Sequence, residues 1–194
     1  MRVNGIPAEI SVIRSKRRTL AAEIRPDGTL LVRAPMRLPE REIIRFLTQK
    51  AQVISKHLLR QQEQERRIAA LPPYTPEELR EMAETAGTLF PQRTAYYASL
   101  LGVTYGRITI RRQKTRWGSC SPSGALSFNC VLVNAPPAVL DSVVVHELCH
   151  RIHPNHSAAF YAEISRVFPD YARCHEWLKE NGAALIRRLP QTSR

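Results

Sequence analysis

The chain has 194 residues, 43% of them hydrophobic, and a formal net charge of +12. This length fits one domain, or one domain with an appended segment, and the apolar content is enough for a buried core, which excludes a largely disordered protein. The charge attracts anions whatever the fold, so it permits nucleic acid, acidic proteins and nucleotide phosphates as partners without requiring any of them.

Membrane insertion and export are both disfavoured. No apolar run approaches the roughly 20 residues that span a bilayer, and residues 1–9 lack the apolar stretch of a signal peptide. Four cysteines are widely spaced, without the C-x-x-C pairs of a zinc ribbon: Cys120, Cys130, Cys149 and Cys174. We therefore expect a soluble cytoplasmic protein with reduced thiols and no membrane partner.

The first 70 residues are predicted to form a small antiparallel sheet followed by a long amphipathic helix. Apolar and polar residues alternate over three segments, residues 9–14, 19–24 and 29–33. Pro26-Asp27-Gly28 separates the last two segments, as in a tight hairpin turn. From Ile43 to Leu59 apolar residues recur at helical spacing, and a polar run up to Arg67 follows.

A proline-rich break at residues 71–76 marks the predicted boundary between an N-terminal part, 1–70, and a catalytic part, 71–194. The two parts are also compatible with one continuous domain. Thr75 or Pro76 begins a second helix, which runs towards Leu101.

Short strands are expected after this helix, at residues 107–112, 125–128 and 131–133. Asn134-Ala135-Pro136-Pro137 ends the last strand and introduces a helix that continues to Glu147. A further helix begins near Ser157 and is interrupted at Pro169, and the last helix covers residues 171–187. Together these elements predict an α+β fold.

The segment His146-Glu147-Leu148-Cys149-His150 indicates the chemistry. Two histidines four residues apart lie on one face of a helix, so both can direct a ring nitrogen at the same ion. Zinc is the expected metal, and Glu147 beside the first histidine is placed to act as general base on a zinc-activated water. An accidental occurrence is disfavoured, because unligated histidines would be costly in the apolar helix that starts near Val139.

Catalytic zinc usually keeps three protein ligands and one open position, so a third ligand must come from elsewhere. Pro154 biases His153 out of the helical region, which ends the helix and lets the chain bring His156 back to the metal. His156 lies six residues after His150, the interval found in the metzincin pattern H-E-x-x-H-x-x-G-x-x-H. His153 replaces the glycine of that pattern and all three methionines precede the site, so the chain is not a metzincin.

Glu163 is the alternative third ligand, because gluzincins take a glutamate from a downstream helix. Asp170 and His175 are further candidates. We favour His156, since neutral imidazole is a common zinc ligand and this residue has no other evident role. His175 is interpreted as a surface or packing histidine, as is His57.

Three further motifs accompany the histidine pair: the tract Lys114 to Ser121, the turn Asn134-Ala135-Pro136-Pro137, and Pro154-Asn155-His156-Ser157. With them, the chain resembles the YgjP-like family of predicted metal-dependent hydrolases, which is similar to SprT-like and other compact gluzincin-type metallopeptidases. The resemblance implies a zincin-like core with the zinc helix packed under a short sheet. It also implies His146, His150 and His156 as zinc ligands and Glu147 as the catalytic residue.

The tract Lys114 to Cys120 also has a physical interpretation, as a strand at the rim of a cleft. An edge strand beside a zinc helix can bind an extended substrate by strand addition. Arg116 is then a candidate substrate-binding residue for a carboxylate or phosphate, and Trp117 a candidate wall of the cleft. The alternative is a structural tryptophan covered by Arg116. Tyr171 is similarly either an oxyanion donor or a core aromatic.

The sequence therefore predicts a zinc-dependent hydrolase, and among hydrolases a metallopeptidase. One alternative is a nucleotide phosphohydrolase of the nucleoside triphosphate pyrophosphatase type, in which Arg112, Lys114 and Arg116 bind a phosphorylated small molecule. Another is a non-catalytic, zinc-stabilised module associated with nucleic acid, which Glu147 disfavours because a structural zinc site needs no general base. Nucleic acid is a permitted but not a favoured partner, since the basic residues are scattered along the sequence without aromatic interleaving. The oligomeric state is left open.

Overall fold

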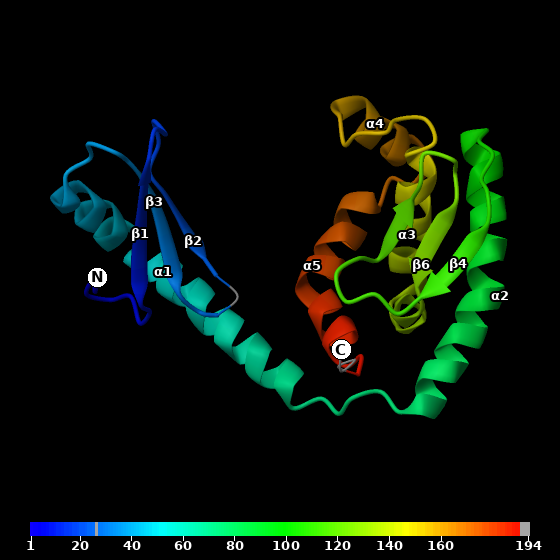
Figure 1. Ribbon diagram of the computed structural model, residues 1–194, viewed down its shortest axis with the longest axis horizontal. Helices are drawn as coiled ribbons and strands as arrows, with labels where there is room; N and C mark the ends of the chain where they lie inside the picture. The colour runs from blue at the N-terminus through cyan, green and yellow to red at the C-terminus, as the bar shows by residue number, and fades with distance from the viewer. Residues whose placement is uncertain (26, 191–194) are drawn as a thin grey trace. The chain divides into compact units, whose positions relative to one another are not determined.

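The computed structural model describes residues 1–25 and 27–190 of the chain. Contacts within it group the residues into two units, Met1–Ala70 and Leu71–Arg194. Figure 1 shows the helices and strands of each unit in chain order. Among the described residues, no helix combines the length and the apolar character that crossing a membrane requires.

The first unit contains a three-stranded mixed sheet, which differs from the antiparallel sheet that the sequence predicts. β1 (Ile10–Ser15) and β2 (Ala21–Ile24) lie on either side of β3 (Leu30–Pro35). β2 pairs with β3 in the antiparallel direction, whereas β1 pairs with β3 in the parallel direction. The antiparallel prediction is therefore wrong for β1.

The composition of β3 explains why this strand occupies the centre of the sheet. Four of its residues are almost fully buried: Leu30, Leu31, Val32 and Ala34. Such an apolar run is typical of a strand with neighbours on both sides. Alternation in β1 and β2 indicates which of their faces is buried, but not which strand lies beside them.

The connection between β2 and β3 is a tight turn, as predicted. The Asp27 carboxylate accepts a hydrogen bond from the backbone N–H of Thr29 at 2.9 Å. Gly28 has a φ of 80°, in the left-handed region that residues with a side chain rarely adopt. Pro26, the first residue of the predicted turn, lies outside the described residues.

α1 (Glu40–Ala69) is the long amphipathic helix expected from the sequence. Its buried residues recur at helical spacing: Ile43, Leu47, Ile54, Leu58 and Ile68. The first four share one hydrophobic cluster with Leu30 and Val32 of β3, so the first unit has a core of its own.

The second unit begins with α2 (Pro76–Leu101), as predicted. The Thr75 hydroxyl accepts a hydrogen bond from the backbone N–H of Glu78 at 3.1 Å, and the Glu78 carboxylate accepts one from the backbone N–H of Thr75 at 2.7 Å. This reciprocal capping box satisfies two N–H groups at the start of the helix. The helix ends at Gly102.

A second mixed sheet follows α2, with the strand order β4-β6-β5. Its strands are β4 (Ile108–Arg111), β5 (Gly118–Cys120) and β6 (Leu126–Asn129). β4 runs parallel and β5 antiparallel to β6. Because β6 is the central strand, β5 lies at an edge of the sheet.

Residues 131–133, predicted as a strand, belong instead to the 3-10 helix η1 (Cys130–Asn134). The Asn129 side chain accepts a hydrogen bond from the backbone N–H of Val131 at 3.4 Å and so caps the start of this helix. A short, buried apolar run fits either structure, which is why the sequence pattern misled here.

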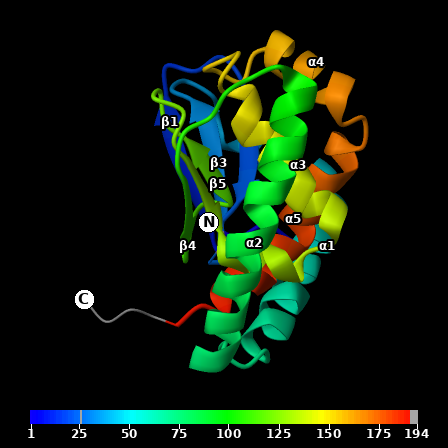
Figure 2. The ribbon, with the colours of Figure 1, turned by 90° about the vertical axis from the view of Figure 1, so that its right-hand side faces the viewer.

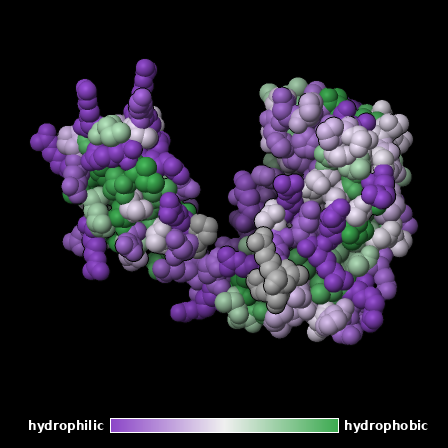
Figure 3. Space-filling view, viewed as in Figure 1, coloured by the Kyte–Doolittle hydropathy of each residue, from purple (hydrophilic) through white to green (hydrophobic). Residues whose placement is uncertain are grey.

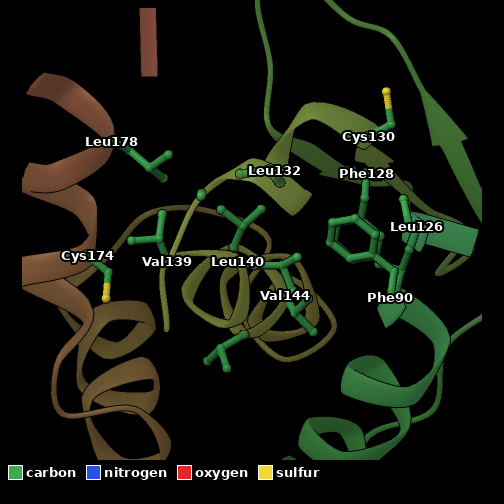
Figure 4. Packing of buried hydrophobic residues seen from close by; sticks show 14 of the residues in the cluster. Phe90, Leu126, Phe128, Cys130, Leu132, Val139, Leu140, Val144, Cys174 and Leu178 are labelled. Carbon is green, nitrogen blue, oxygen red and sulfur yellow. The ribbon is translucent and has the colours of Figure 1, made fainter. Parts of the chain in front are cut away.

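The remaining helices are α3 (Pro137–Cys149), α4 (Ala158–Val167) and α5 (Tyr171–Arg187). α3 contacts α2, α4, α5 and β5, and Figure 2 shows the second unit from the side of α2, with α3 beyond it. The rings of Phe90 and Phe128 stack with their centroids 4.5 Å apart, and Leu140 and Val144 of α3 pack beside them (Figure 4). The predicted α+β class is confirmed, with the histidine-bearing helix at the centre of the second core.

Candidate metal centre

α3 is buried on nearly all sides, and its last turn carries the first histidine of the pair. Each residue from Val139 to Val145 has an exposed fraction of 6% or less. His150 lies at the end of the helix with φ −64° and ψ −14°, so the helical path continues through it. The two histidines therefore share one face, and the ring centroids of His146 and His150 lie 5.0 Å apart.

A tight turn after α3 brings a third histidine to this pair. The carbonyl of Cys149 accepts hydrogen bonds from the backbone N–H groups of Ile152 and His153, at 3.0 and 2.9 Å. Ser157 then caps the start of α4, and the preceding residue, His156, has its Nε2 atom 3.1 Å from Nε2 of His146. One ring nitrogen from each of His146, His150 and His156 lies within 4.8 Å of the other two.

Contacts at the second ring nitrogen orient two of these imidazoles. Nδ1 of His150 lies 3.2 Å from the backbone carbonyl of His153. A carbonyl oxygen can only accept, so Nδ1 carries the proton and Nε2 keeps its lone pair. Nδ1 of His146 lies 2.8 Å from the hydroxyl of Tyr171. Metal-ligating histidines commonly have such a partner at the nitrogen that does not bind the metal, so this donor set fits a zinc ion.

Apolar surroundings keep the first histidine neutral. The Phe160 side chain is fully buried, and its ring centroid lies between 4.8 and 5.0 Å from those of all three histidines. Burial, and after it the neighbouring His150 and His156, lowers the pKa of His146 to about 4. The imidazole is therefore neutral at pH 7, which is the form that binds a metal.

Glu147 is almost fully buried beside the edge strand β5. Burial raises the pKa of its carboxyl to about 7, and the charge of Arg116 partly opposes this shift. A Cβ atom on Gly118 would lie 2.7 Å from both Cγ and Oε1 of Glu147, closer than such atoms approach in proteins. The close contact of strand and carboxylate thus depends on a glycine. A carboxyl that titrates near neutral pH is suited to accept and return a proton.

The alternative third ligands make other contacts. Glu163 forms an ion pair with Arg166 at 2.6 Å. Asp170 forms an exposed ion pair within the first turn of α5, and His175 stacks on an aromatic ring. The structure thus brings His156 to the histidine pair, as the backbone argument from Pro154 predicts.

Arg116 and Trp117 precede β5 and lie in different environments. The Arg116 side chain is exposed, and its charge acts on Glu147. The Trp117 indole packs against α5, since a Cβ atom on Gly182 would lie 2.4 Å from its Cζ2 atom. Backbone carbonyls of both residues accept hydrogen bonds from Asn129, at 3.0 and 2.8 Å. Trp117 therefore has a packing role, and substrate binding by either residue stays a prediction.

Three features of the site escaped the sequence reasoning. Phe160 follows His156 by only four residues, but no motif marks it as part of the site. The glycine in the Arg116-Trp117-Gly118 tract was a signal of close backbone approach. The sequence suggests Tyr171 as an oxyanion donor or a core aromatic, whereas its hydroxyl contacts the candidate ligand His146. No local pattern connects two residues that are 25 positions apart.

Cys149 is not a nucleophile in this site. Its side chain is fully buried, and burial raises the pKa of the thiol to about 12. Burial also raises the pKa of the Cys120 thiol. Both thiols thus stay protonated at neutral pH, as is typical of cysteines that pack in a core.

A buried helix with two histidines, a third histidine after a turn and a buried glutamate define a metal-dependent hydrolase of the zincin kind. Residues 18–80 and 76–181 match a family model described as YgjP-like, metallopeptidase domain. This match covers most of the chain, so the chain belongs to the YgjP-like family and is a metallopeptidase. The resemblance and the enzyme class predicted from the sequence are thereby confirmed. No curated protein matches the chain.

Two solved structures are similar to about half of the chain. One is the metallopeptidase zymogen abylysin of Pyrococcus abyssi, with 21% identity and a TM-score of 0.42, which matches 47% of this chain and 94% of its own. The other is the metallopeptidase zymogen jannalysin of Methanocaldococcus jannaschii, with 20% identity and a TM-score of 0.44, which matches 47% of this chain and 95% of its own.

Proposed function

We propose that this chain hydrolyses peptide bonds at a zinc centre held by His146, His150 and His156, with Glu147 as general base. The observation that supports the proposal most is the convergence of three imidazole nitrogens, within 4.8 Å of one another, beside a buried carboxyl group. A zinc ion held there supplies a Lewis acid, which polarises a carbonyl and lowers the pKa of water to about 7.

Glu147 carries the proton transfers in this proposal. Its carboxylate accepts a proton from the attacking water and then delivers that proton to the leaving amine. Because burial raises its pKa to about 7, both transfers are accessible near neutral pH. Tyr171 and the carbonyl of His153 hold the rings of His146 and His150 through Nδ1, so Nε2 of each would be the atom that binds a zinc ion.

We infer that the peptide binds in an extended form along β5. This strand lies at the edge of its sheet, so the main-chain groups on its outer side are available to pair with a substrate. Gly118 adds no side chain between such a peptide and Glu147. The exposed Arg116 guanidinium at the start of the strand favours a substrate carboxylate nearby.

The compartment that we propose is the reducing cytoplasm. Three of the four free thiols are buried in the second unit, namely Cys130, Cys149 and Cys174. Free, buried thiols are the ordinary state of cysteine in a reducing environment.

The function is tested by incubating the zinc-loaded protein with a peptide library and, in parallel, with a panel of nucleoside triphosphates. We expect peptide cleavage that a chelator abolishes and added zinc restores. Phosphate release without peptide cleavage would overturn the proposal in favour of a phosphohydrolase. Arg112, a phosphate ligand in that alternative, donates instead to the carbonyl of Leu79 at 3.4 Å.

A further inference from the structure

One end of the first unit carries a dense group of arginines. Residues 14–18 contain four basic and no acidic residues, and residues 33–45 contain four basic and two acidic residues. Eight basic against two acidic residues give these 18 positions a net charge of +6, half of the +12 of the whole chain. Half of the net charge is therefore concentrated in two short segments of the chain.

Strand pairing brings the two segments together. β1 and β3 run parallel, so both finish at the same end of the sheet, with Ser15 opposite Pro35. The Arg14 guanidinium donates to the backbone carbonyls of Pro35 and Met36, each at 3.3 Å, and so ties the end of β1 to the chain that leaves β3. Figure 3 shows hydrophilic side chains standing out from this end of the first unit, which is uppermost in the view.

Two of the eight basic residues are paired with carboxylates. Arg33 forms an ion pair with Glu23 at 3.4 Å, and Arg45 forms one with Glu42 at 3.8 Å. We call the other six the basic end, which consists of Arg14, Lys16, Arg17, Arg18, Arg37 and Arg41. All of these except the half-buried Arg17 are exposed.

We propose that the basic end binds the phosphate backbone of double-stranded nucleic acid without reading its sequence. Five of its six residues are arginines, whose planar guanidinium groups match phosphate oxygens with two parallel hydrogen bonds. No aromatic residue occurs in residues 14–18 or 33–45, so the surface lacks the stacking platform that binds unpaired bases. Contact with the phosphate backbone of a duplex is the mode of nucleic-acid binding that fits such a surface.

An anionic membrane fits this surface less well. Peripheral membrane binding combines basic residues with an apolar face that enters the lipid. Three large apolar side chains in or directly beside these segments are exposed, namely Ile13, Met36 and Ile44, by 46%, 59% and 40%. They come from β1, from the turn after β3 and from α1, and not from one amphipathic element. The apolar stripe of α1 is used in the core of the unit and is not available for insertion.

The test uses the full chain and a fluorescently labelled, mixed-sequence DNA duplex of about 20 base pairs, with binding measured by anisotropy over a series of salt concentrations. The variant R18A/R37A/R41A removes three exposed arginines of the basic end. If all three contact phosphates, the slope of log K against log salt becomes less steep by about 2.7, at 0.9 for each contact, and affinity at 0.1 M salt falls at least roughly tenfold. R18K/R37K/R41K keeps the charge and should lie between this variant and the wild type.

The matched control is K50A/K56A/R60A, which removes the same charge from exposed positions farther along α1. It should change the affinity by less than about threefold and leave the slope unchanged. Unfolding midpoints equal to that of the wild type confirm that each variant is folded. Absence of salt-dependent duplex binding by the wild type, or equal losses in the two alanine variants, would overturn the inference. So would binding to vesicles containing phosphatidylserine without binding to the duplex.

Discussion

Gly118 and Glu147 are packed so closely that a Cβ atom on the glycine would lie 2.7 Å from the Glu147 Oε1 atom. Gly118→Ala should therefore displace the carboxylate while leaving the three histidines in place. A shift of about 1 Å in a catalytic group can cost on the order of a hundredfold, so we expect kcat to fall at least tenfold with zinc content unchanged. Gly87→Ala is the control, because a Cβ atom there meets nothing within 4 Å. Unchanged turnover in the Gly118 variant would refute the contact as a catalytic requirement.

Tyr171→Phe should weaken zinc binding without unfolding the protein. The substitution removes the hydroxyl that lies 2.8 Å from Nδ1 of His146 but keeps the ring. Loss of such a partner typically costs 10- to 100-fold in metal affinity, and about tenfold is expected here. A competition titration with a chromophoric chelator measures the change. Tyr161→Phe serves as the control, because it also removes one hydroxyl from a tyrosine beside the site. The Tyr161 ring is exposed, and its centroid lies 6.3 Å from that of His156. Equal affinities in the two variants would contradict a positioning role for Tyr171.

Gly182→Ala should destabilise the second unit by forcing Trp117 away from α5. The added methyl group would lie 2.4 Å from the indole Cζ2 atom, and overpacking of this kind typically costs about 1–3 kcal/mol. Urea unfolding measures the loss, and the tryptophan emission should shift to longer wavelength as the indole becomes exposed. In a Trp117→Leu background, Gly182→Ala should lower the free energy of unfolding by much less. If Gly182→Ala lowers the free energy of unfolding equally in both backgrounds, its contact with the Trp117 indole is not the cause of the loss.

The metal-free protein should show a pH-dependent stability to which His146 contributes. Its folded pKa of about 4, lowered chiefly by burial, lies below the ordinary value of 6.5. Between these values the unfolded chain binds the proton and the folded chain does not, so this contribution is complete above pH 6.5 and is lost as the pH falls towards 4. Glu147 acts in the opposite direction, because its folded pKa of about 7 exceeds the ordinary 4.5.

The two effects are separated by working in a Glu147→Gln background and comparing it with the double variant that also carries His146→Asn. Urea unfolding is measured at pH 7 and pH 4.5 with a chelator present. The protein that keeps His146 should lose more stability on acidification than the double variant does. If both lose the same amount, burial of this imidazole is not the origin of the pH dependence.

Local patterns predicted the helices better than the sheets. The apolar spacing from Ile43 onwards predicts α1, and the capping residue Thr75 predicts the start of α2. Both signals act within a few residues of the chain. The parallel pairing of β1 with β3 follows from the central position of β3, the most apolar of the three strands. That position becomes evident only when the segments are compared with one another, whereas alternation is a pattern within a single segment. The chain through Val131 was assigned the wrong structure for the related reason that burial alone does not distinguish a strand from a helix.

The residues of the candidate site likewise divide into those that a local pattern predicts and those that only tertiary packing brings together. His146 and His150 were predicted to converge because helical spacing requires it, and His156 was predicted from a backbone break at Pro154. Phe160 and Tyr171 complete the surroundings of the histidines through tertiary contacts. Such contacts depend on how α4 and α5 pack on α3, which no short motif specifies.

The central claim is that three histidines hold zinc and that Glu147 transfers the proton. It is tested most directly by measuring zinc content and peptide turnover together in the wild type, in Glu147→Gln and in His146→Ala/His150→Ala. We predict that Glu147→Gln keeps its zinc and loses turnover by roughly a hundredfold to ten-thousandfold, the usual range for a general base, whereas the histidine variant loses zinc. Full turnover in Glu147→Gln, or undiminished zinc in the histidine variant, would contradict the account.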